Sequence, residues 1–185
     1  MTTILTIDPE TRTDTMAREA LLDAALGVAR FGKTSERLRL GRLPAEGLAF
    51  SLKEDGKLVG TVRLWNVLAG GVPALLLGPL AVAKSHAGRG LGTKLMQHSL
   101  GQAALLGHKA VILVGDAPFY ARFGFTSAST DNLALPGPVD ASRFLGCELV
   151  EGALASAFGL VIATGERAPL LRRSARSTAP ERQAA

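Results

Sequence analysis

The chain has 185 residues, of which 47% are hydrophobic and 20% charged; this composition is typical of one globular domain and excludes a disordered chain. Its single cysteine, Cys147, excludes an intrachain disulfide and a cysteine-rich zinc site, and we interpret it as a small buried residue in a strand. No apolar run approaches the roughly 20 residues that a membrane span needs. The first ten residues lack the basic segment of a secretion signal. We therefore expect a cytoplasmic protein.

The net charge of +5 is unevenly distributed along the chain. Residues 166–185 hold five arginines and two glutamates, a balance of +3, which leaves +2 for residues 1–165. We therefore expect one domain over 1–165 and a basic, disordered tail over 166–185. Aromatic side chains do not interleave with the arginines, so nucleic acid is not expected as a partner.

The first half of the chain mixes helical and strand patterns. Residues 13–26 place apolar side chains at helical spacing, and Glu54-Asp55-Gly56 is a hairpin turn signal between two strand segments. The predicted elements, in chain order, are a strand at 4–7, helices at 13–26 and 34–40, strands at 48–53 and 57–67, a turn at 69–73 and a buried strand at 74–82.

The second half predicts a strand–helix–strand arrangement with shorter elements after it. The expected elements are a helix at 90–106, a strand at 110–114, a short helix at 118–123, a loop at 133–138, a strand at 144–150 and a segment at 152–163 that fits a strand or a helix. An antiparallel meander followed by strand–helix–strand predicts an α/β (α+β) fold, with a mixed sheet and helices on both faces.

One dipeptide interrupts the most apolar predicted strand. Pro79 cannot donate to a β-ladder and Gly78 weakens one, so the pair predicts a bulge, a strand that parts from its neighbour, or a simple edge-strand kink. Parting would free backbone N–H and C=O groups for a ligand that has amides of its own.

A glycine-rich turn connects this strand to the clearest helix. Gly88, Gly90 and Gly92 allow the main chain to approach a phosphate closely. The first N–H groups of a helix have no internal partner, and the helix dipole there favours negative charge. The pattern predicts an anion site, and we interpret it together with Tyr120, the only tyrosine in the chain, as one active site.

Three segments carry a family resemblance: Leu77-Gly-Pro-Leu-Ala-Val82, Gly88-Arg-Gly-Leu-Gly92 and Gly115-Asp-Ala-Pro-Phe-Tyr-Ala-Arg-Phe-Gly-Phe125. Through them, residues 48–125 resemble the GCN5-related N-acetyltransferases (GNAT), in particular the YhbS-like bacterial group. The resemblance implies the GNAT fold, a mixed and mostly antiparallel sheet whose strands splay at the coenzyme site. It also implies direct transfer of an acetyl group from acetyl-CoA to the amine of a small molecule or protein, without a metal.

The resemblance also implies roles for individual residues. In this family the strand before the turn bonds the pantetheine arm and thioester carbonyl through its backbone, here Leu80, Ala81 and Val82. The turn and helix start receive the pyrophosphate, here through Ala87, Gly88, Arg89, Gly90, Leu91, Gly92 and Thr93. Arg89 and Lys94 would add positive charge, while Ala87 replaces the family's Gln or Arg, so backbone groups carry most of the binding. Tyr120 takes the position of the general acid that protonates the departing thiolate.

The acceptor side is less specified. The strand before the turn has no carboxylate. His86 titrates in the range of a general base but is interpreted in preference as an exposed loop histidine, and Asp116 is a candidate base or the cap of the short helix that follows it. A water chain to a distant carboxylate, or an acceptor that binds as the neutral amine, is equally open. We expect the acceptor pocket between residues 31–43 and the strand that carries Arg63 and Trp65. The substrate is not specified, and homodimerisation stays open.

Two other functions compete with this interpretation. Residues 27–34 match the phosphate-binding loop pattern G-x-x-x-x-G-K-[ST], and residues 111–116 resemble its companion strand. That loop needs a buried strand before it and a long helix after it, whereas residues 13–26 predict a helix. A non-catalytic acyl-CoA-binding protein is the other alternative, because no carboxylate base is evident.

Overall fold

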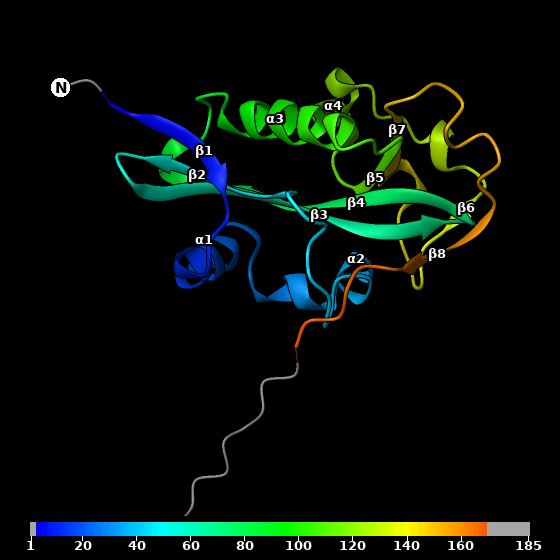
Figure 1. The fold of residues 1–185 in the computed structure, drawn as a ribbon, viewed down its shortest axis with the longest axis horizontal. Helices are drawn as coiled ribbons and strands as arrows, with labels where there is room; N and C mark the ends of the chain where they lie inside the picture. The colour runs from blue at the N-terminus through cyan, green and yellow to red at the C-terminus, as the bar shows by residue number, and fades with distance from the viewer. Residues whose placement is uncertain (1–2, 170–185) are drawn as a thin grey trace, which may run out of the picture.

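Helices cover both faces of one central β-sheet in the computed structural model, which describes residues 3–169 (Figure 1). The strands are β1 (Leu5–Pro9), β2 (Ala49–Glu54), β3 (Lys57–Ala69), β4 (Val72–Val82), β5 (Ala110–Val114), β6 (Leu133–Ala134), β7 (Phe144–Glu148) and β8 (Gly159–Ala163). The helices are α1 (Thr15–Leu26), α2 (Thr34–Arg37), α3 (Leu91–Leu105) and α4 (Ala117–Tyr120). Six 3₁₀ segments lie at Arg12–Asp14, Val28–Gly32, Lys84–His86, Ala121–Phe123, Ala128–Thr130 and Ala141–Arg143.

The strand order confirms the predicted mixed sheet. Within the described residues the main path is β1-β2-β3-β4-β5-β7, β8 pairs with the end of β3, and β6 pairs with β8. The β4–β5 and β6–β8 pairs are parallel, and the others are antiparallel. Helices α3 and α4 lie on one face of the sheet and α1 and α2 on the other (Figure 1). No helix among residues 3–169 is long and apolar enough to cross a membrane.

Several segments differ from their predicted form. Helix α2 ends at Arg37, three residues before its predicted end, because the chain turns so that the next two side chains are buried. The predicted loop at 133–138 contains β6, whose two residues are too few to show a pattern in the sequence. Residues 152–163 form turns followed by β8. Met16, an apolar position of the predicted helix, is 87% exposed, and α1 instead buries Arg18, Leu21 and Leu22.

Alternating side chains of β4 and β5 enter two separate cores. Leu75 and Leu77 pack with α3 residues, including Leu95, on one face, and Leu76 packs with the Trp65 side chain on the other. Both faces of these central strands are therefore buried, which explains their continuous apolar sequence. Cys147 lies in β7 within the α3-side core, which confirms the predicted small buried residue in a strand.

Residues 166–169 remain hydrogen-bonded to the rest of the domain. The Leu43 N–H donates to the Glu166 carbonyl at 2.7 Å, and the Ala168 N–H donates to the Gly41 carbonyl at 2.9 Å. Residues 166–169, part of the predicted disordered tail, thus pair with the loop that follows α2. The rest of that tail, 170–185, lies outside the described residues, and the division into a domain and a tail stays a prediction.

Asp14 ties the start of α1 to the sheet. Its side chain is buried, accepts hydrogen bonds from the Thr11 N–H at 2.9 Å and the Ser51 hydroxyl at 3.1 Å, and pairs with Lys53 at 3.0 Å. Burial alone would raise the pKa of Asp14, but these partners outweigh it and lower the pKa from 3.8 to about 2.

We expect Asp14→Asn to lower the free energy of unfolding by about 2 kcal/mol near neutral pH. The folded-state pKa lies below the unfolded one, so the stabilisation is complete above about pH 4 and is lost as the pH falls toward about 2. Urea unfolding of both proteins across this range measures the effect. A stability difference that stays constant with pH would show that the carboxylate charge is not its origin.

Candidate active site

Strands β4 and β5 separate after a very short parallel ladder. Only two positions pair, Leu75 with Val111 and Leu76 with Ile112. Beyond them β4 continues to Val82 along β3, and β5 continues to Val114 along β7. One edge of β4 therefore has no neighbouring strand over its last six residues, which confirms the predicted parting of strands.

The Gly78-Pro79 dipeptide also forms the predicted bulge. The β3–β4 register shifts so that Arg63 of β3 lies opposite both residues. Gly78 has φ +125°, a conformation that favours glycine, and the peptide bond that follows it is cis. The Trp65 indole N–H donates to the Gly78 carbonyl at 2.5 Å, so this buried acceptor is satisfied inside the sheet.

The open edge of β4 presents backbone groups of alternate residues. The Ala83 N–H donates to the Val59 carbonyl at 2.8 Å, which fixes the direction of the ladder. Because the groups of an antiparallel strand alternate, those of Ala81 point to β3 and those of Leu80 and Val82 point to the open side. Of the three predicted backbone ligands, Leu80 and Val82 are thus free to bond a ligand.

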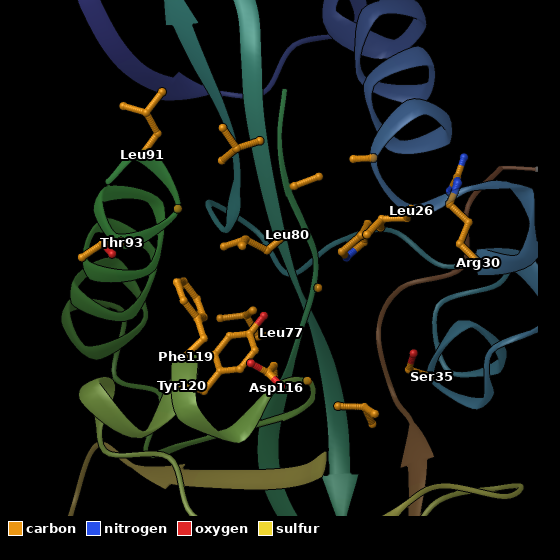
Figure 2. A pocket seen from close by; sticks show the side chains of 18 of the residues that line it. Leu26, Arg30, Ser35, Leu77, Leu80, Leu91, Thr93, Asp116, Phe119 and Tyr120 are labelled. Carbon is orange, nitrogen blue, oxygen red and sulfur yellow. The ribbon is translucent and has the colours of Figure 1, made fainter. Parts of the chain in front are cut away.

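A cavity of about 700 Å³ occupies the space between the separated strands. The start of α3 and the α4 segment border it on one side of β4, and the α1 and α2 segments border it on the other (Figure 2). Its lining brings together ten of the eleven predicted site residues: Leu80, Ala81, Val82, Ala87, Gly88, Gly90, Leu91, Gly92, Thr93 and Tyr120. Arg89 is the predicted residue that does not line it.

The glycine turn has the geometry of an anion cradle. Gly88 and Gly90 have φ +76° and +72°, and Gly90 is the N-cap residue of α3, with no side chain bonded across the cap. The first bond of the helix runs from the Lys94 N–H to the Gly90 carbonyl at 3.1 Å. The N–H groups of the residues between them have no partner inside the helix and lie at the cavity.

Two side chains at the outer edge of the turn, Arg89 and His86, bond to the same carboxylate, Glu54. Arg89 pairs with Glu54, and Lys94 is exposed outside the cavity lining. His86 is bonded at both ring nitrogens, Nδ1 to the Ser85 hydroxyl and Nε2 to Glu54, each at 2.8 Å. Arg89 and then His86 lower the pKa of Glu54 to about 2. With both nitrogens occupied, His86 is a poor candidate for the general base.

Tyr120 reaches the cavity from the end of α4, where Figure 2 shows it near Leu77. Its ring packs edge-on against Phe119 and Phe125, with centroids 4.9 and 5.9 Å away. Burial raises the pKa of Tyr120 above its ordinary value of 10; Arg143 opposes this shift and Asp116 adds to it. The phenol is therefore protonated at neutral pH, as a proton donor must be.

Gly115 makes room for the Tyr120 ring. A Cβ at position 115 would lie 2.2 Å from the Cε2 atom and 2.8 Å from the Cδ2 atom of Tyr120. Any side chain there would force the ring out of its place. The glycine that follows β5 therefore fixes the position of the phenol.

The wall opposite α3 contains charged residues that sequence reasoning missed. Glu36 and Arg39 line the cavity, and Glu36 and Asp116 are the two carboxylates in its described lining. Glu36 and Arg39 fall inside the predicted acceptor segment 31–43, but no motif singled them out. Within that prediction Phe31 is instead exposed, and Arg63 bonds to Glu10 rather than lining the cavity.

The phosphate-loop alternative is wrong on structural grounds. The segment 27–34 follows helix α1 rather than a buried strand, its centre is the 3₁₀ turn at Val28–Gly32, and α2 after it has only four residues. It lacks the strand and the long helix that such a loop needs. Residues 3–169 also contain no group of three or more His, Cys, Asp or Glu side chains placed to hold a metal ion.

Comparison with known proteins supports the same family. Residues 45–127 match the family model described as an acetyltransferase (GNAT) domain. The N-acetyltransferase YhbS of Escherichia coli K12 is 33% identical over 110 residues, which cover 58% of this chain and 66% of that protein, just under two thirds.

Solved structures extend the similarity to the fold. The crystal structure of Escherichia coli YhbS in complex with CoA has a TM-score of 0.74 and 29% identity, covering 86% of this chain and 89% of that one. A Brucella melitensis GNAT family acetyltransferase in complex with acetyl-CoA has a TM-score of 0.58 and 26% identity, covering 77% and 94%. These similarities confirm the predicted fold.

Because Tyr120 is the only tyrosine, its titration can be followed directly by tyrosinate absorbance. We expect a pKa above 10 in the native protein, owing to burial, and a lower pKa in Gly115→Ala, whose added methyl group expels the ring. Gly101→Ala, at an exposed helical site with free space around it, is the control and leaves the titration unchanged. A native pKa at or below 10 would contradict this description of the site.

Proposed function

We propose that this chain, which belongs to the GNAT acetyltransferases, transfers the acetyl group of acetyl-CoA directly to a primary amine. The observation that carries the proposal is one cavity that joins the free edge of β4, the N-terminus of α3 and the partly buried phenol of Tyr120. The free edge suits an arm containing amides, the helix start suits a pyrophosphate, and the phenol suits a departing thiolate.

The coenzyme side works through the main chain. Leu80 and Val82 would bond the pantetheine amides, and the N–H groups of Leu91, Gly92 and Thr93 would receive phosphate oxygens. Ala87 supplies no polar side chain. Arg89 is bonded to Glu54 in this structure, so it would have to exchange that carboxylate for a phosphate to contribute charge.

The reaction then needs proton transfers at both the acceptor nitrogen and the departing sulfur. An alkylammonium acceptor, with a pKa near 10, must lose a proton before attack, and the cavity carboxylates Glu36 and Asp116 are placed to take it directly or through water. The amine nitrogen bonds to the acetyl carbon, the carbon–sulfur bond breaks, and Tyr120 gives its proton to the sulfur. The new amide nitrogen gives up its extra proton, which returns through water to the Tyr120 phenolate. The same proposal places the protein in the cytoplasm, where it would share a compartment with its acyl donor.

We expect Tyr120→Phe to lower kcat for acetyl transfer by about 100-fold or more while leaving the KM for acetyl-CoA nearly unchanged. The substitution removes the proton donor and keeps the ring that packs on Phe119. CoA release is measured with a panel of amines. If the variant transfers acetyl groups at the native rate, Tyr120 is not the acid; if the native protein binds acetyl-CoA and transfers to no amine, it is a binding protein.

We expect Gly90→Ala to weaken acetyl-CoA binding by about 10-fold, because φ +72° costs alanine roughly 1–2 kcal/mol and the turn must shift away from the conformation that presents its N–H groups. Gly101→Ala on the same helix is the matched control: it should raise stability by about 1 kcal/mol and leave binding unchanged. Isothermal titration calorimetry measures both. Equal affinities for the two variants would exclude the turn as the phosphate site.

A further inference from the structure

Arg39 is a buried cation on the cavity wall opposite the glycine turn. Its side chain is only 8% exposed. The Nε atom donates to the Ser35 carbonyl at 3.2 Å, and the Nη2 atom donates to the Ser35 hydroxyl at 3.1 Å and pairs with Glu36 at 3.2 Å. These contacts fix the guanidinium against α2 and set its orientation.

The remaining nitrogen of this guanidinium faces the point where the strands part. Within residues 3–169, Arg39 Nη1 makes no hydrogen bond, and it would lie 3.4 Å from a Cβ built on Gly78. Burial lowers the pKa of Arg39; Glu36 opposes this shift, and the nearby charge of Arg30 adds to it. A donor with this geometry is set for an oxyanion acceptor.

The charge of the surrounding wall favours an anion as well. The lining contains five cations and two carboxylates: Arg30, Lys33, Arg39, Arg122 and Arg143 against Glu36 and Asp116. Arg30 is already held by Glu19 and Asp23 outside the cavity. Without Arg30 the lining still has four cations against two carboxylates, and this net positive charge favours an anionic ligand.

Resting on the function proposed above, we propose that the acceptor is a small amine that carries a carboxylate, and that Arg39 Nη1 binds this carboxylate. Glu36, ion-paired to the same guanidinium, then lies beside the ammonium group of the acceptor. A free amino acid fits this pair of opposite charges. A protein surface does not, because Arg39 is almost completely buried and the cavity must also hold the pantetheine arm.

The turnover test compares amines that differ only at the carboxylate: glycine with glycinamide, β-alanine with its amide, and L-amino acids with theirs. The native protein should prefer the acid over the amide by about 10-fold or more in kcat/KM, because a charge-assisted hydrogen bond is worth about 1.5–3 kcal/mol. In Arg39→Met this ratio should fall to near one, and in Arg39→Lys it should be intermediate. The affinity for acetyl-CoA should not change in either variant.

Arg37→Met is the matched control. Arg37, the last residue of α2, lies two positions before Arg39, is exposed, bonds to the Pro136 carbonyl and does not line the cavity. Its loss changes the net charge of the chain as much as Arg39→Met does. The preference for the acid should survive this substitution. If both arginine variants abolish the preference equally, general electrostatics explain it and Arg39 is not the binding residue.

A binding test separates this proposal from the transfer reaction. Trp65, the only tryptophan, bonds to Gly78 beside Arg39, so its fluorescence can report ligands at this point in protein loaded with CoA. Propionate should bind and propionamide should not, and Arg39→Met or Arg39→Lys should weaken propionate. Binding that depends on Arg39 without transfer to any amine would refute the proposed activity and keep the carboxylate site. No preference for propionate in the native protein, or one kept in Arg39→Met, would overturn the site.

Discussion

The short β4–β5 ladder is the constraint on which the site depends. Two residue pairs join the strands, and beyond them β4 is held by β3 alone. A buried strand edge with unpaired N–H and C=O groups is costly unless something bonds to it. The Gly78 carbonyl is satisfied by Trp65 within the protein, whereas the groups of Leu80 and Val82 face the cavity. The fold thus provides hydrogen-bonding groups for an extended ligand where a paired strand would have used them itself.

Small residues position the chemistry around that opening. Gly115 leaves the space that the Tyr120 ring occupies, and Gly90 lets the chain enter α3 with its first N–H groups toward the cavity. In both places the glycine contributes no side chain. At Gly115 a Cβ would collide with the phenol ring, whereas Gly90 has φ +72°, a backbone conformation that residues with a side chain rarely adopt. The burial of the ring that follows also raises the pKa of the phenol.

Sequence patterns predicted the parts of the structure that depend on local rules. Strand β5 matches its predicted range, α3 differs by one residue at each end, and Gly78-Pro79 marks the bulge because both residues disrupt a ladder locally. Predictions failed where distant contacts decide. Arg89 shows this, since its partner Glu54 lies 35 residues away in the chain. Arg39 and Glu36 were missed because α2 has only four residues, and its place at the cavity is set by packing rather than by periodicity.

The two sides of the cavity use different chemistry, and this difference has a consequence for specificity. On the coenzyme side the candidate ligands are main-chain groups. Their positions depend on the strand, the turn and the helix, so the side chains there can change, as Ala87 illustrates. On the opposite side the polar groups are the side chains of Arg39, Glu36 and Asp116, each of which a single substitution can remove. In the proposed reaction, recognition of the donor thus depends on main-chain groups of the fold, whereas recognition of the acceptor depends on a few side chains. A fold arranged in this way can keep one donor and change its acceptor through substitutions in α2 and the residues that follow it, without disturbing the strands that part to admit the coenzyme.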